Sequence, residues 1–338
     1  MTKILIFRIG EIGDSVVAIP VFRKILTIFD NAEFHLLSNQ KSSDVILDLT
    51  SSKNTFNKIY SISSFKNNIN LLRSLRSENY DYLYYIMPQR SFYQLVRDKI
   101  FFFLTNIPNK YGLGFDCQKR HPSKSGMYES EMNRLYRSIF NENINAHIIQ
   151  KYYYLPPLES IECLSKNAFN IAITLKSKDK VKNWPLENWV DLIKLLNKRI
   201  KNVNFIFIGG ENDNLYVSSV VIRSGINNYR NYAGKLSILK SASIINSADF
   251  YIGLDNGPSH IASILKKNMI SIFSSRNLPG EWYPYNSKVM YTKISCMGCR
   301  LRVCKKYNSK CIKSISPQDV FSMFVEINRR NKKLKYED

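Results

Sequence analysis

The segment Ala233-Gly234-Lys235-Leu236-Ser237, followed by Tyr251-Ile252-Gly253-Leu254-Asp255-Asn256-Gly257-Pro258-Ser259-His260, decides the fold. Its pattern predicts a short basic loop, a helix over 237–246, a β-branched and aromatic strand over 250–254, and a helix over 261–266. Between the strand and the second helix lies a polar turn. In an open α/β sheet, ligands bind where a strand's carboxyl end leads into a helix, because backbone N–H groups and the helix dipole favour phosphate there. The segment therefore predicts an α/β fold with an anion site.

The same alternation of strands and helices runs through both halves of the chain, which favours two parallel sheets with right-handed crossovers. A length of 338 residues also favours two domains. We expect two Rossmann-like domains, 1–155 and 156–338, facing each other across a cleft. Expected strands are 3–8, 33–37, 58–61, 80–87, 110–115, 170–174, 204–208 and 269–273, and expected helices are 16–29, 68–76, 91–105, 130–140, 186–198 and 214–224.

Pro20 and the segment 150–157 complicate this pattern. Pro20 falls inside the first expected helix, so regular helix is predicted only from about Ile19 onward. Segment 150–157 contains Lys, Tyr and Pro, and we expect it to connect the two domains.

Composition limits the classes of protein to which the chain can belong. No segment reaches the roughly 18 apolar residues of a spanning helix, and the N-terminus has a strand pattern rather than that of a signal peptide, so we expect a cytoplasmic protein. The net charge of +22 is typical of proteins that bind nucleic acid, anionic membranes or acidic substrates. Zinc-finger, RNP and helix-turn-helix motifs are absent from the sequence, so nucleic-acid binding is not expected and stays an alternative.

Four of the six cysteines form the pattern C-x2-C-x4-C-x6-C, made by Cys296, Cys299, Cys304 and Cys311; Cys117 and Cys163 are isolated. Seven basic residues and no acidic one lie between Lys293 and Lys313, around this cluster. Four thiolates can hold a structural zinc or iron ion, and the alternative is reduced cysteines that only pack. A closed four-thiolate site leaves no open position for catalysis.

The first strand leads into Arg8-Ile9-Gly10-Glu11-Ile12-Gly13-Asp14, in which two glycines permit a tight turn. Asp14 is placed to cap the following helix. The pattern R-x-G-x-I-G-D-x-x-x-x-x-P, together with AGK and D-N-G-P-S-H-x-A, resembles the heptosyltransferase-like glycosyltransferases of family nine. The resemblance implies a GT-B fold with an N-terminal acceptor domain and a C-terminal nucleotide-sugar domain. It also implies that Asp14 is the catalytic base and explains Pro20.

The resemblance also implies roles for other residues. On the acceptor side it points to Gly10, Gly13 and Arg134, with Glu131 beside it, although a solvated helix face is the alternative for the last two. On the donor side, K-x-W-P-x-x-x-W makes Lys182 a phosphate contact, with its tryptophans either at the site or in the core. Glu211 is expected at the ribose, with Asp213 as a rival or a helix cap.

In the polar turn, Asp255 is expected to anchor the donor sugar or ribose, and Asn256, Gly257 and Pro258 to shape the backbone. His260 is expected at the diphosphate or sugar, or else satisfied by backbone. The chain departs from the family pattern at Asn256, where Thr or Ser is more usual, and at Ser274-Ser275-Arg276-Asn277. Asn256 would remove or replace one phosphate hydrogen bond, and the departure at 274–277 leaves the identity of the donor open.

The expected activity is inverting transfer of heptose from ADP-heptose to a lipopolysaccharide or lipooligosaccharide core, with no metal or other cofactor needed for catalysis. An anionic glycolipid acceptor at the inner face of the cytoplasmic membrane fits the basic charge, and makes the protein peripheral. Alternatives are another GT-B enzyme acting on a different nucleotide sugar, including an epimerase, and a basic nucleic-acid-binding α/β protein.

Overall fold

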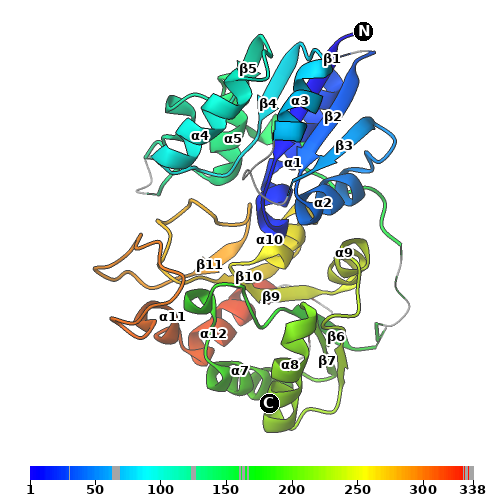
Figure 1. Ribbon diagram of the computed structural model, residues 1–338. Coiled ribbons are helices and arrows are strands. Elements are labelled where there is room, and N and C mark those ends of the chain that lie inside the picture. Colours follow the sequence, from blue (N-terminus) through cyan, green and yellow to red (C-terminus); the bar gives the residue numbers. More distant parts are fainter. Residues whose placement is uncertain are drawn as a thin grey trace. The chain divides into compact units, whose positions relative to one another are not determined.

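A computed structural model describes residues 1–338 except 30, 63–68, 123–126, 160, 162–163, 166, 330, 332–333 and 335–338. The chain divides into two compact units, unit 1 (Met1–Pro156) and unit 2 (Pro157–Asp338), each built on its own parallel sheet (Figure 1). Cys163 and the predicted helix start at Asn68 lie outside the described residues. No helix of the described ranges combines the length and the apolar character needed to cross a bilayer.

Unit 1 contains a five-stranded sheet in the order β3-β2-β1-β4-β5, with every pair parallel. Its strands are β1 (Lys3–Arg8), β2 (Glu33–Ser38), β3 (Phe56–Ser61), β4 (Tyr82–Tyr85) and β5 (Asn109–Tyr111). Its helices are α1 (Ile12–Ile28), α2 (Gln40–Thr50), α3 (Ile69–Ser77), α4 (Phe92–Phe103), α5 (Glu131–Phe140) and α6 (Ala146–Tyr152), with the 3-10 turn η1 (Asp116–Gln118).

Helices cover both faces of this sheet. Leu5 and Phe7 of β1 share one hydrophobic cluster with Leu75 of α3 and with Leu95 and Phe102 of α4. Because side chains alternate along a strand, the buried residues between them point to the other face. Right-handed crossovers place α1 on that second face, and α1 packs against α2, α5 and α6.

Unit 2 contains a six-stranded parallel sheet in the order β11-β10-β9-β6-β7-β8. Its strands are β6 (Phe169–Ile173), β7 (Val203–Phe207), β8 (Tyr229–Asn231), β9 (Phe250–Leu254), β10 (Met269–Ile272) and β11 (Lys288–Met290). Its helices are α7 (Leu186–Arg199), α8 (Asn214–Ser224), α9 (Ile238–Ser247), α10 (Gly257–Ile264), α11 (Lys310–Lys313) and α12 (Pro317–Asn328), with the 3-10 turns η2 (Lys180–Lys182) and η3 (Glu211–Asp213).

The prediction that regular helix begins near Ile19 was wrong, because α1 begins at Ile12 and continues through Pro20. Glu11 and Asp14 form a capping box that satisfies backbone donors at the helix start. Pro20 lacks the N–H that would bond the carbonyl of Val16, and it is buried within the helix.

Two other local predictions need correction. Helix α10 begins at Gly257 rather than at 261, because Asn256 caps it and Pro258 occupies its first turn, where no backbone donor is needed. The segment expected to be a connection begins inside α6, whose N-cap Asn145 accepts a hydrogen bond from the backbone N–H of Ile148. Both caps use Asn, whose side-chain oxygen bonds the free N–H groups of a first turn.

Candidate active site

In unit 1 the glycine turn after β1 holds Asp14 at the start of α1. The side chain of Asn39, after β2, makes two hydrogen bonds with the backbone of Gly10, of 3.0 and 3.1 Å. A Cβ atom at Gly10 would lie 2.8 Å from Cβ of Asp14, so only glycine fits. Oδ2 of Asp14 accepts a hydrogen bond of 2.8 Å from the backbone N–H of Glu11. The N-cap is therefore Glu11, and Asp14 takes part in capping as the third residue of the helix rather than as the N-cap itself.

Arg8 is fully buried beneath this turn. Its guanidinium donates to the carbonyl oxygen of Ile86 at 2.7 Å and to the backbone carbonyl of Asp14. Burial lowers the pKa of Arg8 to about 10, although the carboxylates of Asp14 and Glu131 act in the opposite direction. A cation therefore lies close to Asp14. Both of these hydrogen bonds go to backbone carbonyl oxygens and not to the Asp14 carboxylate.

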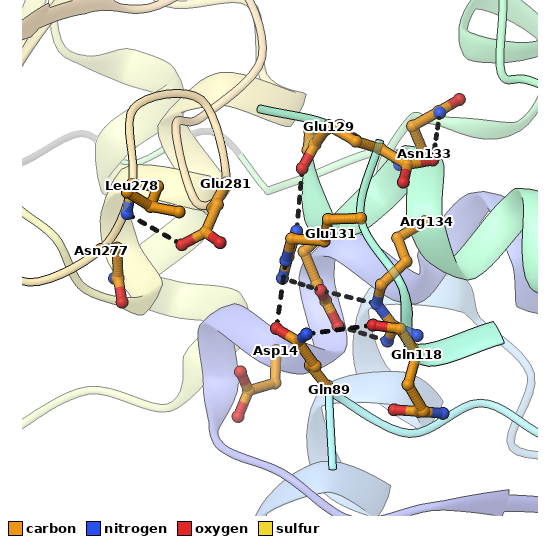
Figure 2. Close-up of polar contacts among 12 residues, drawn as sticks. Asp14, Gln89, Gln118, Glu129, Glu131, Asn133, Arg134, Asn277, Leu278 and Glu281 are labelled. Atoms are coloured by element: carbon orange, nitrogen blue, oxygen red, sulfur yellow. Dashed lines mark hydrogen bonds and ion pairs between the residues drawn. The ribbon is translucent and has the colours of Figure 1, made fainter. Parts of the chain in front are cut away.

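The solvated helix face considered for Glu131 and Arg134 was wrong, because each is only 1 % exposed. Arg134 makes a fork to Glu131, with Nε to Oε2 at 3.0 Å and Nη2 to Oε1 at 2.7 Å (Figure 2). The guanidinium also donates to the carbonyl oxygens of Met87 and Cys117, both at 2.7 Å. Arg134 thus joins α5 to the segments that follow β4 and β5.

Arg120 is a second cation on Glu131, and no sequence motif pointed to it. It bonds the Glu131 carboxylate, the carbonyl oxygen of Glu129 at 2.9 Å and Oε1 of Gln89 at 3.2 Å. Burial opposes ionisation of Glu131, but Arg134 and Arg120 outweigh it and hold the pKa of that carboxyl below its ordinary value. Unit 1 therefore carries a buried cluster of paired charges beside Asp14.

In unit 2, the structure joins two predicted donor-site residues directly. Nζ of Lys182, in η2 after β6, lies 2.8 Å from Oδ2 of Asp255, which directly follows β9. Asp255 is buried, and Oδ2 also receives a longer hydrogen bond of 3.4 Å from Asn277. Oγ of Ser177 donates to the carbonyl oxygen of Asp255 at 2.9 Å, a contact that sequence reasoning missed.

The turn after Asp255 is held by the side chain of Asn256. Its Oδ1 accepts from the backbone N–H of Ser259 at 3.2 Å, which caps α10. Its Nδ2 donates to Oγ1 of Thr174 at 3.1 Å and to the carbonyl oxygen of Lys176 at 3.0 Å. A Thr or Ser here would reproduce the cap but not the two donated bonds. Gly257 and Pro258 form the first turn of α10, which points its N-terminus at the carboxyl edge of the sheet.

His260 lies in the second half of that turn and is only 3 % exposed. Its Nδ1 is buried and has no hydrogen-bond partner among the described residues, so the backbone does not satisfy this nitrogen of the imidazole. Burial lowers its pKa from 6.5 to about 4, with Asp255 opposing and Lys182 reinforcing the shift. The imidazole is therefore neutral at pH 7 and lies close to the Lys182–Asp255 pair.

Glu211 is exposed in η3, immediately after the two glycines that follow β7. The backbone N–H of Gly234 donates to the carbonyl of Gly209 at 2.9 Å, and a Cβ at Gly234 would lie 2.6 Å from Cα of Glu211. Asp213 accepts from the backbone N–H of Gly210 at 2.9 Å, at the start of η3. It stands at the N-cap position of α8 but makes no side-chain capping bond to that helix. The AGK loop and Glu211 thus lie together at the ends of β8 and β7.

The loop that departs from the family pattern is tied to the rest of unit 2 by arginines. Arg276 forms an ion pair with Asp179, and its Nη2 donates to the carbonyl of Arg300 at 3.1 Å. Arg300 in turn contacts Glu281 at 2.5 Å and Oδ1 of Asn277 at 3.0 Å. These long-range pairs fix the loop beside Asp255.

Comparison with known proteins shows the family to which the chain belongs. The family model for glycosyltransferase family 9 (heptosyltransferase) matches residues 69–310, more than half of the chain. The chain belongs to this family.

The relatives are consistent with that membership. "Lipopolysaccharide heptosyltransferase 1" of Campylobacter coli is 23% identical over 358 aligned positions, covering 96% of this chain and 98% of the relative. "Lipooligosaccharide heptosyltransferase 2" of Campylobacter jejuni subsp. jejuni serotype O:6 is 28% identical over 93 residues, 27% of this chain and 29% of that protein. The match to this second relative thus spans under a third of its length.

Solved structures share the fold. "E. coli ADP-heptose lps heptosyltransferase II" superposes with a TM-score of 0.66 at 17% identity, covering 98% of this chain and 100% of that one. The "bacterial iron-containing dodecameric glycosyltransferase TibC" of enterotoxigenic E. coli H10407 gives 0.59 at 13% identity, covering 97% and 76%. The two parallel sheets of this family 9 chain are those of the GT-B fold.

The cysteine cluster of this family 9 chain is present as free thiols. Cys296 and Cys299 lie near enough to Cys311 to help burial raise the pKa of its thiol. A tetrahedral site with metal–sulfur bonds of about 2.3 Å needs sulfurs about 3.8 Å apart. Among the described residues, the four sulfurs do not form a group of three within 4.8 Å, so the structure shows suitable donors without a formed site.

One other group in the described ranges has metal-ligand chemistry: Glu33, His35 and Glu78, at the amino-terminal edge of the first sheet. Its atoms already have internal partners. Both ring nitrogens of His35 are hydrogen-bonded, at 2.6 Å to the Tyr80 hydroxyl and 2.8 Å to Glu33. Lys58 and Lys3 donate hydrogen bonds to Glu78 at 2.7 and 3.1 Å. The bond from Lys58 has the largest effect on the pKa of Glu78, which is lowered to about 2. This cluster is a network of hydrogen bonds and ion pairs that joins strand ends.

The buried His260 predicts a pH dependence of stability. Its folded pKa of about 4 lies below the unfolded value of 6.5, so the unfolded chain binds the extra proton first. Stability therefore falls as pH drops from about 6.5 to about 4, by on the order of 2 kcal/mol for this group. His260→Gln should flatten the fall in Tm between pH 6.5 and 4.5. The exposed His147→Gln serves as control, and a parallel pH slope for parent and His260→Gln would contradict the prediction.

Proposed function

We propose that this family 9 chain is an inverting heptosyltransferase that transfers heptose from ADP-heptose to a lipopolysaccharide or lipooligosaccharide core. The observation that carries the proposal is the Lys182–Asp255 pair, 2.8 Å apart, beside the N-terminus of α10. A cation, a carboxylate and a helix N-terminus together match the diphosphate and the hydroxyl groups of a nucleotide sugar. We assign the nucleotide sugar to unit 2 and the acceptor to unit 1.

In the proposed donor site, the Lys182 ammonium carries the charge that a departing diphosphate needs. Asp255 holds that ammonium in place before the donor arrives and offers oxygens to sugar or ribose hydroxyls. Glu211, exposed at the end of β7, is assigned to the ribose. The buried neutral His260 supports α10 behind the diphosphate. Positive charge and backbone N–H groups can stabilise the leaving group without a metal.

In the proposed reaction, the carboxylate of Asp14 accepts the proton of the acceptor hydroxyl as its oxygen attacks the anomeric carbon. The bond from that carbon to the diphosphate oxygen breaks on the opposite face, and its electron pair leaves with ADP, so the configuration inverts. Gly10 and Gly13 keep the backbone close around Asp14. Arg134 lies on the acceptor side and, through its bonds to Met87 and Cys117, acts by positioning loops.

The proposed partners follow from this chemistry. An anionic glycolipid acceptor suits a chain of net charge +22 and places the enzyme in the cytoplasm, peripheral at the inner membrane face. A different nucleotide sugar is the second candidate, favoured by the unusual Arg276–Asp179 and Asn277–Asp255 contacts in the donor loop. Thermal-shift titration with ADP, UDP, GDP and CDP distinguishes these, because a ligand at a hundred times its Kd stabilises by about 2.7 kcal/mol.

Asp14→Asn should lower the transfer rate about 10²–10⁴-fold while leaving ADP binding unchanged, because only the proton acceptor is lost. The measurement is kcat for sugar transfer, with an ADP titration of the same protein. Glu11→Gln, a change of a neighbouring half-exposed carboxylate, is the matched control and should keep nearly full activity. Transfer by Asp14→Asn at close to the parent rate would leave Asp14 as a cap only.

Lys182→Ala should weaken ADP binding about 10–100-fold and adenosine binding much less, since a hydrogen bond to a charged group is worth about 1.5–3 kcal/mol. Isothermal titration with both ligands measures the difference. Lys180→Ala, at an exposed lysine of the same turn, is the control. Equal losses for ADP and adenosine would show that Lys182 does not contact the phosphates.

We also propose that Cys296, Cys299, Cys304 and Cys311 bind one structural zinc or iron ion, outside the catalytic step. Their spacing, free thiols and basic surroundings support this, and the iron-containing glycosyltransferase TibC shares the fold. Elemental analysis of untagged protein should give about one ion per chain. Cys296→Ser/Cys299→Ser should lose the ion, while Cys117→Ser should keep it. Metal-free protein with full ADP binding and activity would leave a packing role.

A further inference from the structure

Helix α4 is apolar on both of its sides. Leu95 and Phe102 face the sheet and belong to the hydrophobic cluster of unit 1. On the opposite side, Tyr93, Ile100 and Phe103 are 85%, 58% and 75% exposed. Their spacing of seven and three residues keeps these three on one stripe of a helix. A surface helix normally turns its polar face outward, whereas these three large apolar side chains of α4 are exposed in the described part of the chain.

The exposed stripe also includes Phe92, the first residue of α4 (labelled in Figure 1), and it reaches beyond the helix to Phe115 and Leu104. Phe92 stacks on Phe115 with ring centroids 5.6 Å apart, and Leu104 extends the stripe at the other end; all three are exposed. Exposed apolar residues scattered singly need no explanation, but a continuous patch marks a protein or membrane contact.

Most charges around this stripe are positive, and the exposed acid Asp116, next to Phe115, is paired with Lys119. The one acid of α4, Asp98, is fully buried and pairs with Arg97 at 2.7 Å and Arg90 at 3.3 Å. Arg97 is about half exposed, and the ammonium of Lys99 lies 4.4 Å from the Phe115 ring centroid. The outer side of α4 thus presents aromatic and aliphatic groups with cations beside them.

A basic pocket adjoins the same helix. It has a volume of about 490 Å³ and is lined by Arg73, Arg76 and Asn79 on one side and by Thr105 and Asn106, which follow α4 directly, on the other. Two guanidinium groups with amide and hydroxyl neighbours suit a phosphate oxygen cluster, because guanidinium bonds phosphate through paired donors.

We propose that the outer face of α4 and the Arg73–Arg76 pocket bind the surface of an anionic phospholipid membrane. Helix α4 would lie in the interface with Tyr93, Ile100 and Phe103 at the acyl boundary, and the pocket would take a lipid phosphate. This inference rests on the proposed function, because a membrane surface is useful to an enzyme whose acceptor is a glycolipid. It names the surface by which the enzyme reaches that acceptor. A second copy fits less well, because a two-fold contact brings like charges of the same patch together.

Vesicle co-sedimentation tests this surface with the full chain. The parent protein should bind phosphatidylcholine vesicles that contain about a third phosphatidylglycerol far more tightly than phosphatidylcholine alone, and added salt should weaken that binding. Arg73→Gln/Arg76→Gln should weaken it about 30-fold, taking about fivefold for each basic residue near the surface. Ile100→Ser/Phe103→Ser should weaken it about tenfold or more even at low salt.

Leu215→Ser/Ile222→Ser is the matched control, because these residues of α8 are 82% and 78% exposed but are separated by serines on their stripe. It should bind vesicles like the parent. Equal binding by Ile100→Ser/Phe103→Ser and parent would overturn the inference. So would a concentration-dependent dimer, seen by light scattering, that this variant abolishes.

The outcome is separable from that of the proposed function. Vesicle binding is measured without any sugar donor, and every variant is checked for parent-like Tm and ADP binding. Anionic vesicle binding that depends on α4, in a protein that transfers no heptose, would overturn only the proposed function. If the protein transfers heptose to a soluble acceptor but does not bind anionic vesicles, only the inference of a membrane-binding surface is overturned.

Discussion

Parallel strand pairing is the constraint on which every candidate functional residue depends. In a parallel sheet all carboxyl ends lie at one edge, so residues far apart in sequence meet there once the register is set. In unit 2, β6 pairs with β9, and this brings the turn at Lys182 to within 2.8 Å of Asp255. In unit 1, β1 lies between β2 and β4, so Asn39 after β2 reaches Gly10 and Ile86 after β4 reaches Arg8.

Both units also place charged groups where water does not reach them. Burial of a lone guanidinium or carboxylate is costly, and such groups persist only when their partners satisfy them. Glu131 has two arginines, Arg134 has four hydrogen bonds, and the carboxylate of Asp255 has Lys182 and Asn277. The buried His260 avoids this cost because its imidazole remains neutral at pH 7. The result is a set of groups held rigidly in place, which is what a site that stabilises a charged transition state requires.

Except for β8 and β11, the sequence predicted the described strands of both sheets to within a few residues, because period-two and continuous apolar runs are local signals. The strands β8 and β11 have only three residues each and carry no such run, so they were missed. It also predicted that Asp255 begins a turn into a helix. It did not find Arg120 or the Arg276–Asp179 pair, because partners 97 residues apart leave no local pattern. The start of α10 was missed since Gly257 and Pro258 are typical of loops, and only the cap by Asn256 makes them helical. Roles inferred for Asp14 and Glu211 came from family resemblance rather than from spacing.

The Arg276–Asp179 pair has a consequence for exchanging loops between relatives. The donor loop 274–277 departs from the usual family pattern, yet its arginine is matched by an aspartate on a separate loop, and its neighbour Asn277 is held by Arg300. Replacing residues 274–277 alone would remove Arg276. The carboxylate of Asp179, which is only 19% exposed, would then lose this ion-pair partner. The segments around 179, 276 and 300 therefore form one transferable module. A substitution at one of these three segments therefore needs matching substitutions at the other two to keep the buried charges paired.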